Sequence, residues 1–169
     1  KSIFKKYSTQ RAYKYFSKSG KLEHKICDNF EEANRYLDRF YYQHIERWSN
    51  TKFPSLFLDQ NNRDFYQALV KNLLPNQQLL FSVVLYNNEP ISFHFGFDYN
   101  SNIVWYKPSF SIKYANKSPG KVMIRYLIEY ALDNNKNELD FTIGDEQFKD
   151  RFKNHTRQNA NIMIFENKL

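Results

Sequence analysis

The chain of 169 residues contains little of three residue types that define particular classes of protein. Its single cysteine, Cys27, excludes an internal disulfide and a zinc site built from clustered cysteines. Four glycines and five prolines argue against a disordered or low-complexity chain. The sequence also lacks an apolar run long enough to cross a bilayer and the apolar core of a signal peptide. We therefore expect one folded domain with a sizeable core, in a reducing, cytoplasmic setting.

The net charge of +7 is concentrated at the start of the chain, because the other 18 basic residues match the 18 acidic ones. We interpret residues 1–20 as a basic helix and residues 21–169 as a single domain. The helix could bind a phosphate-rich partner or an anionic membrane. It could equally be a solvated face, or an interface with a missing partner. Its charges, with Lys21, are Lys1, Lys5, Lys6, Arg11, Lys14, Lys18 and Lys21.

The periodicity of apolar residues predicts a mixed α/β fold, with a mostly antiparallel sheet flanked by helices. The last long helix crosses between two strands, and such a crossover normally joins parallel strands. In such a sheet, ligands bind beyond the strand ends, next to the N-terminus of the crossing helix. The predicted helices span residues 1–18, 30–48, 61–73, 119–133 and 145–152, and the predicted strands span 21–27, 79–86, 91–97, 103–107, 138–143 and 160–165.

The start of the crossing helix predicts an anion site. Ser118 is a good N-cap, Pro119 suits the first helical position, and Gly120 allows close approach to the backbone. Lys121 places a cation against the positive end of the helix dipole, which an adjacent anion would offset. The alternative is an ordinary capped helix with a solvent-exposed lysine. The sheet geometry adds Tyr106 and Lys107 to this site.

Two histidines are candidates for a cleft. His44 lies on the inward stripe of the helix 30–48, with Arg47 one turn further on, so both could line a cleft. The alternative for His44 is a buried, hydrogen-bonded core histidine. His94 lies on the face of strand 91–97 that carries the smaller residues, where a structural role is the alternative.

A candidate general base follows the strand 138–143. Gly144 allows a sharp turn, and Asp145 could then accept a proton or cap a short last helix. Lys149, one turn beyond, could pair with Asp145 and keep it ionised. No triad or metal motif is specific enough to assign the chemistry from the sequence.

These motifs resemble the GNAT acyltransferase fold, and more closely its CelD/BcsL-type group, named for cellulose biosynthesis. The resemblance implies that backbone amides before the crossing helix bind the pyrophosphate of acyl-coenzyme A. It also places Arg47, His94 and Asp140 in the substrate cleft. The matching motifs are residues 44–48, residues 89–96, residues 118–121, Asp140-Phe141, residues 144–146 and Phe148-Lys149.

The chain departs from the group's pattern in three ways. Gly120 is the single glycine of a loop that is usually richer in glycine, and Phe148 stands where the group commonly has tyrosine. The group also has an N-terminal lobe of similar fold, so we expect this chain to be the C-terminal lobe, packed against a missing lobe or forming a homo-oligomer. Two-lobed architecture also resembles the Fem-type aminoacyltransferases, which use aminoacyl-tRNA.

The resemblance implies acyl transfer from acyl-coenzyme A, such as acetyl-CoA, to an unidentified amine or hydroxyl. A cell-envelope or polysaccharide component could carry this acceptor group. Ser118, Gly120 and Lys121 would anchor the donor, and Asp145 would act as the base, with His44 as the alternative base. No metal is expected. The alternatives are aminoacyl transfer from tRNA and a catalytically silent binding lobe of a larger protein.

Overall fold

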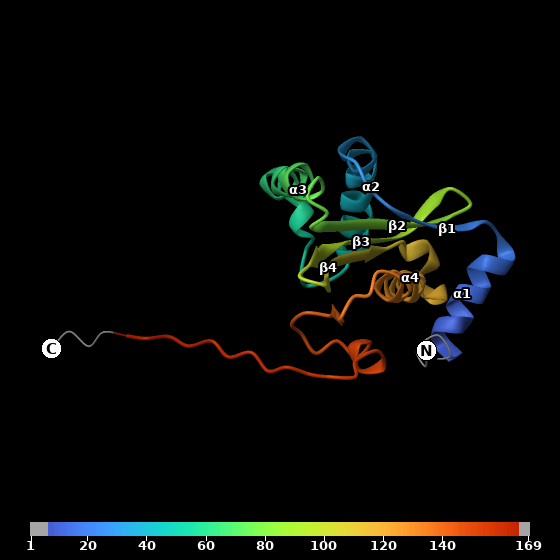
Figure 1. Ribbon diagram of the computed structural model, residues 1–169. Helices are drawn as coiled ribbons and strands as arrows, with labels where there is room; N and C mark the ends of the chain where they lie inside the picture. Colours follow the sequence, from blue (N-terminus) through green and yellow to red (C-terminus); the bar gives the residue numbers. More distant parts are fainter. Residues whose placement is uncertain (1–6, 166–169) are drawn as a thin grey trace.

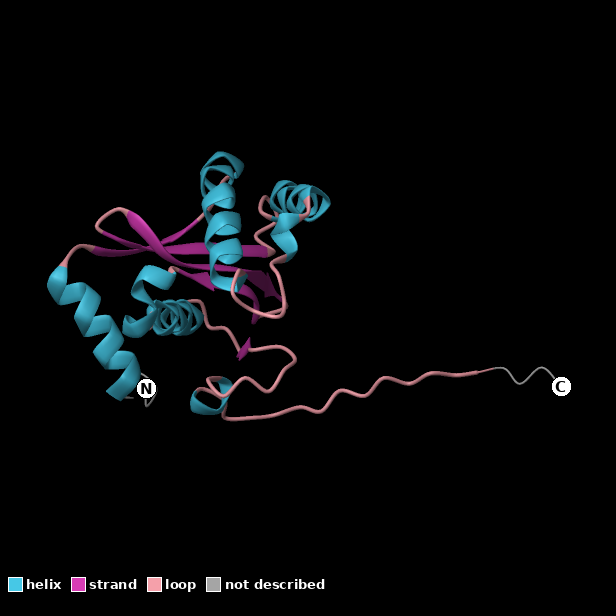
Figure 2. Ribbon diagram, turned by 180° about the vertical axis from the view of Figure 1, so that it is seen from behind, coloured by secondary structure: helices cyan, strands magenta, loops and turns pink. Residues whose placement is uncertain are grey.

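The computed structural model describes residues 7–165 and has one five-stranded sheet with helices on both faces (Figures 1 and 2). The strands lie in the order β1-β2-β3-β4-β5, and all neighbours are antiparallel except the parallel pair β4 and β5. The predicted mixed α/β fold and the parallel crossover are therefore confirmed. The elements are α1 (Tyr7–Ser19), β1 (Leu22–Ile26), α2 (Phe30–Trp48), η2 (Leu56–Leu58), α3 (Gln60–Leu73), β2 (Leu79–Tyr86), β3 (Glu89–Tyr99), β4 (Asn102–Phe110), η3 (Ile112–Lys117), α4 (Pro119–Asp133), β5 (Glu138–Asp140) and η4 (Lys149–Arg151).

Alternation along the central strands divides the core into two layers, because successive side chains point to opposite faces of a sheet. Phe81, Phe93 and Phe95 pack beneath α2 and α3 on one face. The opposite face carries Leu80, Val84 and Ile103, covered by α4 and by Ala12 and Phe16 of α1. The basic helix thus packs within this same chain, while its predicted first residues, including Lys1, Lys5 and Lys6, lie outside the described residues. Within residues 7–165 no helix combines the length and apolarity needed to span a membrane.

The inward face of α3 follows the sequence pattern only in part. Apolar spacing in the predicted helix 61–73 favours Phe65, Ala68, Leu69 and Leu73 as inward residues, and Leu69 and Leu73 do pack against the core. The structure, however, buries Tyr66 and Val70 and leaves 53% of Phe65 exposed. The Tyr66 ring packs between Phe57 and Phe95, at centroid distances of 4.8 Å from each. These tertiary contacts set the rotation of a helix whose own sequence offers two nearly equivalent apolar faces.

β4 does not end before Pro108, although the predicted strand covered only residues 103–107. β5 pairs with β4 only as far as Val104, so the later residues of β4 form a free edge of the sheet. A proline at a free edge lacks only an N–H that would have had no partner there. β4 therefore continues past Pro108 to Phe110.

Three predictions at the C-terminal end are also wrong. β5 spans only Glu138–Asp140, because Thr142 adopts a positive φ of 59° that ends the extended strand. Asp145 caps no helix, since the helical residues there are the single turn η4. Residues 160–165 form no strand, although they run as an extended chain away from the body (Figure 1).

Two buried histidines, His44 and His94, and the partly buried His24 make few hydrogen bonds. His24 stacks on Tyr126 at 4.7 Å, and burial lowers its pKa to about 4. His94 stacks on Trp105 at 5.1 Å, and burial lowers its pKa to about 3. The carbonyls of Leu80 and Val104 lie near the His94 ring, but neither ring nitrogen has a partner in good hydrogen-bond geometry. Burial, then the charges of Arg47 and Lys107, lowers the pKa of His44 to about 4.

Because the pKa values of these three histidines are lowered in the folded protein, we predict that the protein loses stability in mild acid. Below pH 6.5 the unfolded chain protonates each histidine, whereas the folded protein keeps it neutral until its lowered pKa is reached. The histidines therefore cost no stability above pH 6.5. Between pH 6.5 and its own lowered pKa, each histidine decreases the unfolding free energy by up to about 1.4 kcal/mol for every unit that the pH falls. Urea unfolding at several pH values measures this slope.

His24→Phe should flatten that slope by one proton, because a phenyl ring keeps the stacking on Tyr126 but cannot titrate. His155→Gln is the matched control, since His155 is exposed. An unchanged slope in His24→Phe would contradict the account.

Candidate active site

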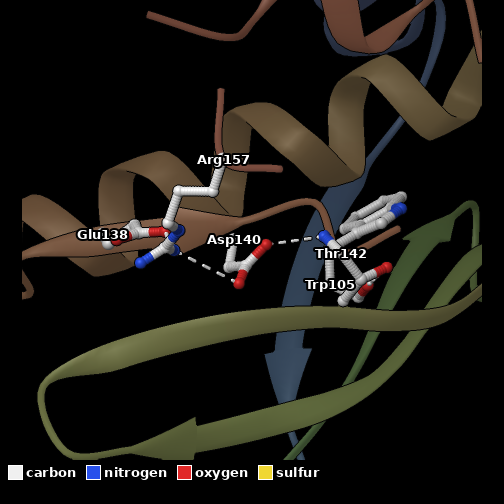
Figure 3. A network of polar contacts seen from close by, with 5 residues as sticks. All are labelled: Trp105, Glu138, Asp140, Thr142 and Arg157. Atoms are coloured by element: carbon white, nitrogen blue, oxygen red, sulfur yellow. Dashed lines mark hydrogen bonds and ion pairs between the residues drawn. The ribbon is translucent and has the colours of Figure 1, made fainter. Parts of the chain in front are cut away.

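β4 and β5 separate at the point where the site begins. Their backbone pairing stops at Val104 and Asp140. Beyond that pair, the Thr142 Oγ1 hydroxyl donates a hydrogen bond to the Trp105 carbonyl at 3.3 Å (Figure 3). A register shift opposite Phe95 and Phe97 also gives β4 one extra residue in this region. The backbone of β4 beyond Trp105 is therefore left unpaired on the edge that faces β5.

A cavity of about 210 Å³ lies at this opening. It is bounded by the end of β4, the N-terminus of α4, the last turn of α2 and the short turn around η4. The structure thus brings the predicted Ser118, Gly120 and Lys121 together with Arg47. The lining consists of Arg47, Ser92, Trp105, Pro108, Ser109, Phe110, Ala115, Ser118, Pro119, Gly120, Lys121, Ile124, Phe148 and Phe152.

The N-terminus of α4 is built differently from the prediction. Ser118 adopts the left-handed conformation, with φ 58° and ψ 57°, and its side chain makes no capping hydrogen bond. Its carbonyl accepts the Lys121 N–H at 3.0 Å, and Pro119 has no N–H to offer. A Cβ placed on Gly120 would meet only Phe110 Cδ1, at 3.7 Å, so the space beside Gly120 is open. A ligand can therefore approach the backbone closely at Gly120.

Both charged residues that line the cavity are cations. Arg47 donates from Nη1 to the Pro108 carbonyl at 3.1 Å, and its guanidinium lies 4.2 Å from the centre of the Phe110 ring. Burial lowers the pKa of Arg47. Burial, followed by the charges of Arg151 and Arg11, also lowers the pKa of Lys121. Since the described lining residues include no Asp or Glu, these desolvated cations favour an anionic ligand.

His44 is a buried residue of α2 and lies outside the cavity lining. Its Nδ1 is 2.8 Å from Ser55 Oγ, and its ring packs edge-on against Phe57 at 5.0 Å. This is the position expected for a hydrogen-bonded core histidine, and the lowered pKa keeps it neutral at pH 7. His94 also lies outside the lining, although the Trp105 ring on which it stacks forms part of the cavity wall.

Tyr106 and Lys107 point to the other side of β4. The Tyr106 ring stacks on Tyr66 of α3 at 6.3 Å and packs against Phe97 at 5.3 Å. Lys107 Nζ lies 5.3 Å from the centre of the Tyr106 ring. Neither residue is part of the cavity lining, so the structure separates them from Ser118, Gly120 and Lys121.

Lys149 does not pair with Asp145, contrary to the prediction. Its Nζ lies 2.7 Å from Glu146 Oε2 and donates to the carbonyls of Ile143, at 2.7 Å, and Gly144, at 3.3 Å. Gly144, with a φ of 115°, makes the turn that brings these carbonyls to the lysine. Asp145 is exposed, and no ion pair to it is formed by the described part of the chain.

Asp140 is the last residue of β5, and its carboxylate contacts Thr142 and Arg157. Its Oδ1 accepts the Thr142 N–H at 2.7 Å, and its Oδ2 lies 3.4 Å from Arg157 Nη2, which also binds Glu138 (Figure 3). Asp140 is not among the cavity-lining residues. Within residues 7–165, no three His, Cys, Asp or Glu side chains group as metal ligands.

Several residues of the cavity wall were not predicted from the sequence. Ser109 has a buried hydroxyl without a partner in good geometry, and its carbonyl accepts a hydrogen bond from Ser92 Oγ at 2.9 Å. Phe148 and Phe152 close the cavity opposite α4. The four-residue spacing of these two aromatics after Gly144 was the available signal for a wall on this side.

Comparisons with known proteins show the family and the fold of the chain. A family model described as an acetyltransferase (GNAT) domain matches residues 4–150. A possible acetyltransferase from Clostridium difficile 630 is 13% identical with a TM-score of 0.53, covering 86% of this chain and 97% of that one. An aminoglycoside acetyltransferase from an uncultured soil metagenomic sample, in complex with trehalose, is 14% identical with a TM-score of 0.53 and coverage of 86% and 95%.

A third solved structure is AAC(6')-Iy in complex with the bisubstrate analogue CoA-S-monomethyl-acetylneamine. It is 8% identical with a TM-score of 0.54, and the alignment covers 88% of this chain and 99% of that one. A comparison with curated proteins found no match. At these identities the solved structures show a shared fold.

Proposed function

Because the chain belongs to the acetyltransferase (GNAT) family, we propose that its cavity binds an acyl-coenzyme A donor whose acyl group passes to an amine or hydroxyl acceptor. The protein is a GNAT-type acyltransferase, and enzymes of this kind use acetyl-CoA. The observation that carries the proposal is the meeting of an open helix N-terminus at Gly120 with the desolvated cations Arg47 and Lys121. Diphosphate is the donor group that this combination suits.

The donor would lie across the N-terminus of α4. Ser118 keeps a free capping hydroxyl, Gly120 leaves room for a phosphate oxygen, and Lys121 supplies a charge partner. Coenzyme A, when bound, supplies the acyl group as a thioester. Its arm would follow the free edge of β4, where Tyr106 and Lys107 are proposed to position it from the opposite face of the strand.

In acyl transfer the new amide or ester bond forms as the thioester C–S bond breaks, so the attacking amine or hydroxyl must lose a proton and the departing coenzyme A thiolate must gain one. We propose Asp145 as the base that removes the proton of the acceptor, because the neighbouring carboxylates are occupied: Glu146 by Lys149, and Asp140 by Arg157. Asp145 also lies three residues before Phe148, which lines the cavity. Lys149 would then position the loop through its carbonyl contacts. His44 remains the alternative base, although its pKa of about 4 makes it a weak base and it lies outside the cavity lining.

For the acceptor we propose a hydroxyl-bearing component of the cell envelope, as the resemblance to the CelD/BcsL-type group implies. A similar structure is an aminoglycoside acetyltransferase in complex with trehalose. Polycationic acceptors need nearby carboxylates, and the described cavity lining has none, which supports a neutral or anionic acceptor. Arg47, His94 and Asp140 are the residues proposed to line the acceptor cleft, and the chain is proposed to act as one lobe of a larger assembly.

Aminoacyl transfer from tRNA is a second candidate, favoured by the exposed cations Arg11, Lys14 and Lys18 on α1. Arg11 also adds to the positive charge around Lys121, so phosphates near the cavity mouth would be attracted in either case. The two donors differ in their salt dependence. Binding of tRNA should weaken steeply with salt, because many phosphates are neutralised at once.

Calorimetric titration with acetyl-CoA and with tRNA tests the proposal. We expect acetyl-CoA to bind and to raise the melting temperature. At an acetyl-CoA concentration of a hundred times the dissociation constant, the unfolding free energy should increase by about 2.7 kcal/mol. Lys14→Ser with Lys18→Ser should leave acetyl-CoA binding unchanged. Tight, salt-sensitive tRNA binding without acetyl-CoA binding would instead support aminoacyl transfer, and donor binding without turnover on any acceptor would support a silent lobe.

A further inference from the structure

His94 is a fully buried residue of β3, the central strand of the sheet. Within the described residues, neither of its ring nitrogens has a partner in good hydrogen-bond geometry. A buried polar ring without such partners stabilises a core less than an apolar side chain of similar size. Core packing alone therefore does not account for a histidine at this position.

Gly96 leaves the space that the His94 ring occupies. A Cβ placed on Gly96 would lie 2.3 Å from His94 Nε2 and 2.2 Å from the Val104 carbonyl oxygen. Residues two apart in a strand point to the same face of the sheet, so the His94 ring can lie over Gly96 only because that residue has no side chain. Gly96 also lies opposite the register shift at which β4 gains its extra residue. His94 therefore packs beside the part of β4 where the cavity begins.

Trp105 connects His94 with the cavity. The two rings are stacked, with centroids 5.1 Å apart and planes inclined by 21°. Trp105 lines the cavity, whereas His94 does not. The Trp105 ring also packs against Phe141 at 6.0 Å and against Phe148, another lining residue, at 6.5 Å. An effect of His94 on a ligand in this cavity would therefore act through the Trp105 ring.

We propose that His94 is a positioning residue, whose flat ring in the space beside Gly96 holds the Trp105 ring where it forms the cavity wall. Aromatic pairs have preferred geometries, so a flat ring at position 94 restricts the Trp105 ring more than an aliphatic side chain can. The ligand used below, acetyl-CoA, is taken from the proposed function, and that part of the inference rests on it. The contact between His94 and Trp105 needs no ligand and is testable in the free protein.

Fluorescence of Trp105 tests the positioning in the ligand-free protein. The chain has two tryptophans, so Trp48→Phe leaves Trp105 as its single tryptophan. In that background, His94→Leu should shift the Trp105 emission to longer wavelength and make it easier to quench with acrylamide, because a loosened ring meets more water. His94→Phe should keep the parental emission, since it retains a flat ring. The control His24→Leu removes the histidine that stacks on Tyr126 instead, and should leave the Trp105 emission unchanged.

Calorimetric titration with acetyl-CoA tests the consequence for the cavity. We expect His94→Leu to weaken binding by about three- to tenfold, the loss that corresponds to one stacked aromatic contact. Its melting temperature should stay close to the parental value, because an unpartnered polar ring is replaced by an apolar side chain of similar size. His94→Phe and His24→Leu should bind acetyl-CoA as the parent does. His94→Val, which is smaller and cannot crowd Gly96, replaces His94→Leu if that variant does not fold.

The two measurements separate this inference from the proposed function. Parental Trp105 fluorescence or parental acetyl-CoA affinity in a folded His94→Leu would overturn the positioning role. A loosened Trp105 in His94→Phe would overturn it as well, and so would equal effects in His24→Leu, which would indicate a general loosening of the core. If the parent protein itself binds no acetyl-CoA, the proposed function is contradicted, and the fluorescence result alone decides the role of His94.

Discussion

Gly120→Asp is expected to weaken acetyl-CoA binding by about a hundredfold or more, because juxtaposed like charges cost several kcal/mol in a desolvated site. The new carboxylate would lie at the open space beside the first turn of α4, where the donor diphosphate is proposed to bind. The fold should tolerate it, since the nearest atom to a Cβ there is Phe110 Cδ1 at 3.7 Å. A carboxylate in a first helical turn also interacts favourably with the helix dipole. The variant should therefore be at least as stable as the parent protein.

Two control variants separate the effect of the added charge on acetyl-CoA binding from the effect of the added volume. Asn116→Asp adds the same charge at an exposed position four residues earlier and should bind acetyl-CoA nearly as well as the parent. Gly120→Ala should stabilise the ligand-free protein by up to about 1 kcal/mol. It should also weaken the binding of acetyl-CoA less than Gly120→Asp does. Calorimetry and thermal melting measure both quantities. Parental affinity in Gly120→Asp would show that the donor does not use the start of α4.

Asp145→Asn is expected to reduce turnover by roughly a hundredfold or more if Asp145 removes the proton from the acceptor. Asparagine has nearly the same shape but cannot act as a base. Stability should be unchanged, because Asp145 is exposed and caps no helix in the structure. The assay is steady-state turnover with a competent donor and acceptor, with the unfolding free energy measured alongside.

Asp150→Asn provides the matched control for this experiment. Asp150 is an exposed carboxylate in the same segment, paired with Lys153 at 2.6 Å, and it does not line the cavity. Its loss should leave turnover close to the parental value. Full activity of Asp145→Asn would exclude Asp145 as the base, and His44 would be the next residue to change.

The sequence predicted those parts of the fold that depend on local pattern. The alternation from Phe93 to Phe97 and the long apolar helix after Pro119 are strong periodic signals, and a crossing helix leaves few topologies other than a parallel β4–β5 pair. That Ser118, Gly120 and Lys121 line one cavity was predictable for the same reason, since they are adjacent in the chain. The sequence predicted a cleft position for Arg47, but beside His44, and its meeting with Ser118, Gly120 and Lys121 was not predicted.

What could not be predicted depends on contacts between distant residues. The rotation of α3 is set by the packing of Tyr66 between Phe57 and Phe95. The continuation of β4 past Pro108 depends on β5 being short, and the partner of Lys149 depends on the turn at Gly144. Ser109 and Trp105 carry no sequence motif, so their place in the cavity wall emerged only from the folded structure.

A titration of the ¹⁵N-labelled protein with coenzyme A, followed by amide chemical shifts, tests the central claim most directly, because it locates the donor without needing an acceptor. We predict saturable shifts concentrated at Phe110, Ser118, Gly120 and Lys121, and their loss in Gly120→Asp. An absence of shifts at millimolar coenzyme A, or shifts confined to residues that do not line the cavity, would contradict the assignment of this cavity as the donor site.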